Sequence, residues 1–68
     1  MNDDVFNMEL RKFLKQVGVT SQRAIEQAVQ QGIADGRIGG TEALKARMVL
    51  TIEGLDLRHE VTDDIKLA

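Results

Sequence analysis

Apolar residues in the first part of the chain recur at helical spacing. They are Phe6, Leu10, Phe13, Leu14 and Val17, and in a helix they form one stripe. This pattern predicts a helix over about residues 3–17. Asn2 is a suitable N-cap, and Gly18 stands where a helix commonly ends in the left-handed conformation.

A second helical stripe follows, made by Ile25, Ala28, Val29 and Ile33. It predicts a second helix over about residues 21–35, which Thr20 or Ser21 would cap and which Gly36 would end. The two helices would meet in a tight corner at Gly18-Val19-Thr20.

After the helices the apolar period changes from 3.6 to 2, which predicts strands over about residues 46–53 and 55–61. A two-residue turn at Glu53-Gly54 would join them as an antiparallel hairpin. That turn would place Arg47 opposite Glu60 and gather the apolar side chains on one face.

The order of the elements predicts an α+β fold, in which two N-terminal helices pack on a C-terminal antiparallel β-hairpin. A turn at Thr62-Asp63-Asp64 would lead to a short third strand over residues 65–67. We expect residues 1–68 to form a single small domain.

Composition narrows the function classes. The 68 residues contain no cysteine, which removes disulfides and thiolate metal sites. The net charge of −2 and the lack of Trp and Tyr speak against a nucleic-acid partner. No apolar run approaches the roughly 20 residues of a membrane span, so we expect a cytoplasmic protein with no membrane partner. Because so short a chain has a marginal core, self-association is one expected route to stability.

The corner between the predicted helices resembles the turn of bacterial helix-turn-helix proteins, which makes DNA binding an alternative function. Seven side chains could contact bases or phosphates, namely Arg11, Lys12, Lys15, Ser21, Gln22, Arg23 and Gln27. The next core positions of that motif would fall on Ala24 and Gln27, one residue out of step with the observed stripe. The corner is therefore predicted to be structural.

His59 is the only histidine, and the predicted register places it on the apolar face opposite Met48. We interpret it as a half-buried structural residue, because alternation sends Glu60 to the other face and breaks up any acid–base or metal cluster. The sequence thus predicts no catalytic residue, no metal ligand and no cofactor, and we expect a protein that is not an enzyme.

The segments "DVFNM", "RKFLKQVGVTSQR" and "LTIEGLDLRH" resemble a small family of uncharacterised bacterial proteins. Ala24 departs from that pattern, where an acidic residue is expected. The resemblance implies a bacterial, cytoplasmic setting and supplies no site residues, since the function of the family is unknown. Our leading interpretation is a non-enzymatic protein–protein interaction module. Its partner would be another protein or a second copy, bound through a sheet edge or an apolar patch.

Overall fold

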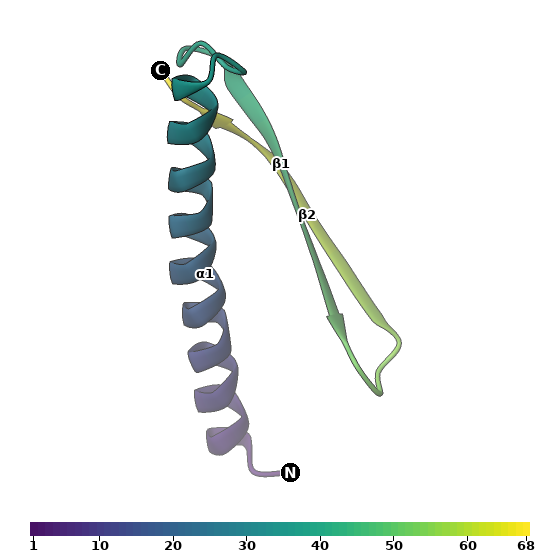
Figure 1. Ribbon diagram of the computed structural model, residues 1–68. Helices are drawn as coiled ribbons and strands as arrows, with labels where there is room; N and C mark the ends of the chain where they lie inside the picture. Colours follow the sequence, from purple (N-terminus) through teal and green to yellow (C-terminus); the bar gives the residue numbers. More distant parts are fainter. The chain divides into compact units, whose positions relative to one another are not determined.

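The computed structural model describes residues 1–68 and contains one long helix followed by a β-hairpin (Figure 1). Helix α1 spans Asp3–Ala34, strand β1 spans Ala43–Ile52 and strand β2 spans Leu57–Lys66. The chain divides into two units, Met1–Arg37 and Ile38–Ala68. The α+β class is confirmed, but the helical part differs from the prediction.

The prediction of two helices joined by a corner is wrong, because α1 continues through Gly18. Three glycines have positive φ, and Gly18 is not among them. The Thr20 hydroxyl donates a hydrogen bond to the Gln16 carbonyl oxygen at 2.8 Å, a bond typical of a helix interior rather than a cap. A glycine inside a helix costs only about 1 kcal/mol against alanine, and the rest of a long helix can offset that.

The continuity of α1 also aligns part of the second predicted stripe with the first. Val17 and Ala28 lie eleven residues apart, and eleven residues make about three helical turns. Both side chains therefore lie on the same side of one straight helix. Ile25 and Ala28 thus continue the first stripe, whereas Val29 and Ile33 are rotated by about 120° and 160° from Val17 and lie off it.

Both ends of the helical region lie where the sequence predicted them. At the start, the Asn2 side chain accepts a hydrogen bond from the Val5 N–H at 3.1 Å, which caps the helix. At the end, Gly36 adopts a φ of +80°, which favours glycine, and its N–H donates to the Ile33 carbonyl oxygen at 3.3 Å.

The hairpin is a two-stranded antiparallel sheet whose register differs from the prediction by two residues. Ile52 pairs with Leu57 instead of Leu55, so four residues rather than two form the turn. Gly54 has a φ of +84°, and the Leu55 N–H donates to the Ile52 carbonyl oxygen at 3.2 Å. The predicted strand limits of 46–53 and 55–61 are therefore wrong.

The far end of the hairpin explains why the longer register is preferred. It pairs Leu44 with Ile65 and Lys45 with Asp64, an apolar pair and a pair of opposite charges. Residues 65–67 do not form a third strand, because Ile65 belongs to β2 and the Leu67 N–H donates to the Glu42 carbonyl oxygen at 3.1 Å. The predicted turn at residues 62–64 is wrong for the same reason.

A shift of two residues leaves every side chain on its predicted face, because strand faces alternate with a period of two. The face we call the inner face carries Leu44, Ala46, Met48, Leu50, Ile52, Leu57, His59, Val61, Asp63 and Ile65. Its apolar character was predicted correctly. That the helical part covers one face of the hairpin stays a prediction.

The chain has no buried hydrophobic core. No hydrophobic side chain is buried, and the one buried residue of α1 is Gly32. Phe6 and Phe13 are each 49% exposed, and Leu14 is 50% exposed.

Candidate functional site

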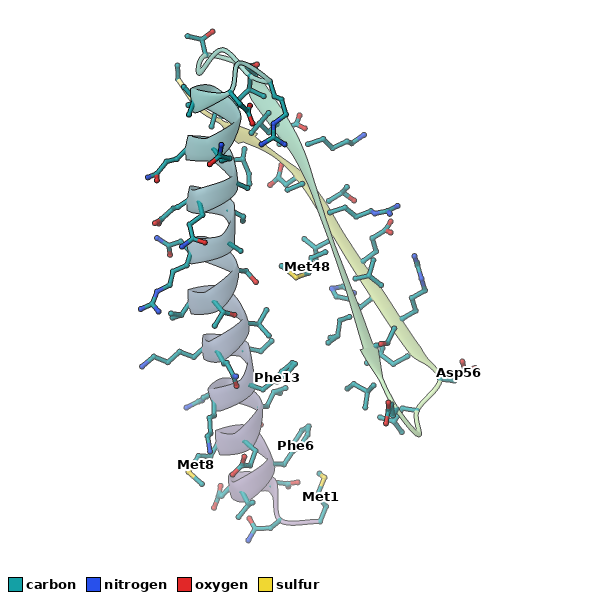
Figure 2. The ribbon with its side chains drawn as sticks, viewed as in Figure 1. Met1, Phe6, Met8, Phe13, Met48 and Asp56 are labelled. Atoms are coloured by element: carbon teal, nitrogen blue, oxygen red, sulfur yellow. The ribbon has the colours of Figure 1, made fainter.

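The largest apolar feature of α1 is its continuous stripe, which we call the α1 seam. It consists of Phe6, Leu10, Phe13, Leu14, Val17, Ser21, Ala24, Ile25 and Ala28. Figure 2 shows Phe6 and Phe13 on the same side of α1, with Met8 on the other side. Val17 and Ser21 are half-buried, and the remaining members are exposed.

The α1 seam contains no charged residue, and the charges of α1 concentrate on the side opposite to it. Val19 marks that side, because it lies two residues, or about 200° round the helix, from Val17 and from Ser21. Four charged residues share the side of Val19 at spacings of four and seven residues, namely Lys12, Lys15, Arg23 and Glu26. The helix is therefore amphipathic between about residues 9 and 28, whereas Met8 and Ile33 place apolar side chains on the side of Val19 near its two ends.

The inner face of the hairpin is the second apolar surface. Met48 is 45% exposed and Val61 is 53% exposed. A two-stranded hairpin is at best marginally stable by itself, so its apolar face needs a covering layer. Each of the two units thus presents an exposed apolar surface.

The outer face of the hairpin is polar. Lys45, Arg47, Glu60 and Thr62 line an open depression there. Arg47 Nη1 lies 3.8 Å from Glu60 Oε1, and Arg58 Nη2 lies 3.4 Å from the same oxygen. The predicted ion pair of Arg47 with Glu60 exists, but diagonally, because Arg47 pairs with Thr62 in the ladder. Exposed ion pairs contribute at most about 1 kcal/mol each, so this face keeps the edges solvated rather than forming a site.

The loop between α1 and β1 is organised by Glu42. Its carboxylate accepts hydrogen bonds from the backbone N–H groups of Gly39, Gly40 and Thr41, at 2.8 to 3.1 Å. These bonds, that of Gly39 first, lower the pKa of Glu42. Three converging N–H groups would bind an anion, and here a carboxylate of the chain itself occupies that position.

The residue that follows α1 is held in a similar way. Arg37 Nε donates to the Asp35 carboxylate at 2.9 Å, and its backbone N–H donates to the same carboxylate at 3.2 Å. The side-chain bond from Arg37 is the main cause of the lowered pKa of Asp35. Both carboxylates therefore have structural partners within their own loop.

The seven side chains proposed for DNA contact all lie on α1, but the helix-turn-helix corner that would organise them does not form. Ser21 lies on the α1 seam, whereas Lys15 and Arg23 lie on the opposite side. The Gln22 side-chain amide donates to Glu26 Oε1 at 2.9 Å, so it is engaged within the helix. The candidates do not gather on one recognition surface.

His59 lies on the inner face as predicted, but it pairs with Leu50 instead of Met48. It is exposed rather than half-buried. The change of pairing partner follows from the shifted register. No group of three or more His, Cys, Asp or Glu side chains comes close enough to hold a metal ion.

Sequence reasoning missed the middle of the α1 seam. Ser21 was interpreted as a cap or a DNA contact, and Ala24 as a break in a motif. The signal that could have found the seam is the eleven-residue spacing between equivalent positions, which links Leu10 to Ser21 and Phe13 to Ala24.

A comparison with protein families finds a match over the whole chain. A model described as "Family of unknown function (DUF6494)" matches residues 1–68. The chain belongs to the DUF6494 family. The resemblance to a family of unknown function is thereby confirmed, while the bacterial and cytoplasmic setting stays a prediction. No curated protein and no solved structure matches the chain.

Membership of the DUF6494 family assigns no catalytic, binding or cofactor residues to this chain. Its α1 lacks the long apolar stretch that a membrane-crossing helix needs. Any function must therefore be argued from the surfaces described above.

Proposed function

We propose that the chain is a non-enzymatic protein–protein interaction module whose main contact surface is the α1 seam. The observation that carries this proposal is that no hydrophobic side chain of the chain is buried. Soluble monomers rarely leave large contiguous apolar patches open to water, and such patches mark interaction sites. The exposed phenylalanines and leucines of the seam form such a patch.

The chemistry of the α1 seam favours a protein partner over a nucleic acid. Phosphate groups are bound by cations, which supply most of the affinity for DNA, and the seam has none. A partner with an apolar surface could cover the seam without removing any charge from water, which would otherwise be costly. The spacing of its bulky residues matches the anchors by which an amphipathic helix binds an apolar surface.

Two substitutions on opposite sides of α1 test the proposal. Leu14→Asp places a charge in the seam, whereas Val19→Asp places the same charge on the polar side, between Lys15 and Arg23. The full chain and both variants are immobilised and exposed to a lysate of the source cell. We expect the unsubstituted chain and Val19→Asp to capture the same proteins, and Leu14→Asp to lose them.

The proposal fails if all three baits capture the same set of proteins. Circular dichroism of each bait checks that α1 remains helical. If a bait captures a second copy of this same chain, that copy also counts as a partner.

A further inference from the structure

We infer that the partner of the α1 seam is a second copy of the same chain, with the two α1 helices packed antiparallel. This inference deepens the proposed function and rests on it. Two observations carry it, namely the gradient of side-chain size along the seam and the placement of charge.

Side-chain size along the α1 seam is graded from one end to the other. The N-terminal half carries Phe6, Leu10, Phe13 and Leu14. The C-terminal half carries Ser21, Ala24, Ile25 and Ala28, three of which are small. A copy that runs in the opposite direction would place its small half against the bulky half at both ends.

The antiparallel alignment that matches large with small residues is also symmetric. It pairs Leu10 with Ala28, Phe13 with Ala24, Leu14 with Ile25, and Val17 with Ser21. Along the sequence, the midpoint of each pair falls at or next to Val19. A single two-fold axis near Val19 therefore generates all four pairs, each of them twice, as a symmetric dimer interface requires. Phe13 and its partner Ala24 lie on one flank of the seam, and Leu14 and its partner Ile25 lie on the other. Two antiparallel helices that face each other bring the same flanks together, so both pairs can form.

A parallel pair would fit less well. It would stack Phe13 on its own copy at one end and Ala28 on its own copy at the other, so the distance between the helix axes could not be uniform. It would also bring the acidic first turns together, each with Asp3 and Asp4. In the antiparallel pair the helix dipoles oppose each other, and the charged residues around Val19 point away from the seam.

The first experiment measures mass. Sedimentation equilibrium of the full chain over a wide concentration range should give twice the 7.6 kDa of one chain. Leu14→Asp should weaken this association by about 100-fold or more, because the symmetric dimer would bury the new charge twice. Val19→Asp should leave it unchanged. A monomer at every concentration overturns the inference, and it would mean that the hairpin or another protein covers the seam.

The second experiment tests direction, using the absence of natural cysteine. Leu10→Cys and Ala28→Cys variants are prepared separately, then unfolded together, refolded and treated with a short bismaleimide. The antiparallel pair predicts cross-linking in the mixture and none in either variant alone, since equivalent residues of the two copies would lie about 27 Å apart along the axis. Cross-linking of each variant with itself overturns the antiparallel arrangement.

A third variant separates the seam from the sheet edge. Val49→Asp changes the outer face of the hairpin, where Val49 is 43% exposed. If this substitution dissociates the dimer and Leu14→Asp does not, the inference is wrong. A chain that is monomeric when purified but still captures another protein through the seam would overturn the inference and leave the proposed function intact.

Discussion

Replacing Gly18 by alanine tests the main difference between the sequence prediction and the structure. Two separate helices would place Gly18 at a left-handed corner, where a β-carbon is unfavourable. In the structure Gly18 is inside α1, and a β-carbon built there meets no atom within 4 Å. The two arrangements therefore predict opposite signs for the same substitution.

The expected gain follows from helix propensity. Alanine is more favourable than glycine in a helix interior by about 0.8–1.0 kcal/mol, and Gly→Ala substitutions at compatible sites stabilise proteins by about 0.4–1 kcal/mol. No steric term reduces this gain, because the space beside Gly18 is open. For a domain of this size, the gain corresponds to a rise in Tm of roughly 2–8 °C.

Thermal unfolding followed by circular dichroism measures the effect, at one fixed protein concentration because association makes Tm depend on concentration. Gly36→Ala is the matched control, since a β-carbon there also meets nothing within 4 Å but φ is +80°. Left-handed φ costs an alanine about 1–2 kcal/mol, so this variant should lower Tm. A lower Tm for Gly18→Ala would refute the continuous helix.

Two further predictions concern the loop carboxylate and the DNA-binding alternative. Because its backbone partners lower the pKa of Glu42, its contribution to stability is present above its unfolded-state pKa of about 4.3 and is lost as the pH falls through the lower folded pKa. Urea unfolding from neutral pH down to about pH 3 should therefore show a smaller acid-induced loss of stability for Glu42→Gln than for the unsubstituted chain, and equal losses would contradict this role. In a titration of random-sequence duplex DNA at low salt, we expect no saturable change in anisotropy, since Lys15 and Ser21 lie on different sides of α1. Binding that weakens steeply as salt is added would restore that alternative.

The local signals of the sequence predicted the ends of the helical region and the faces of the strands. Asn2 and Gly36 act through their own hydrogen bonds and φ angles, so a few neighbouring residues determine them. The period-two pattern of the hairpin likewise determines its faces without any knowledge of the fold.

The sequence prediction was wrong where one local signal is compatible with two structures. Gly18 can end a helix or be tolerated inside one, and the residues around it are compatible with both. The register of the hairpin could not be found from its faces, because a slip of two residues preserves them. What decides the register is the pairing at the far end of the strands, beyond the segment in which alternation was read.

Only part of the α1 seam could be recognised from the sequence. Its bulky residues were recognised as a stripe, but they were assigned to the inside of a domain. Because these residues are exposed in the structure, we propose a contact surface there rather than a core.

The four-residue turn of the hairpin offers a convenient attachment point. Leu55 is 65% exposed in this turn, and Asp56 lies at the tip of the hairpin, beyond the last strand pair (Figure 2). An epitope or a fluorophore-binding tag inserted here would lengthen the loop without moving any strand residue to the other face. The chain could then be followed in living cells with both α1 and the inner face unaltered.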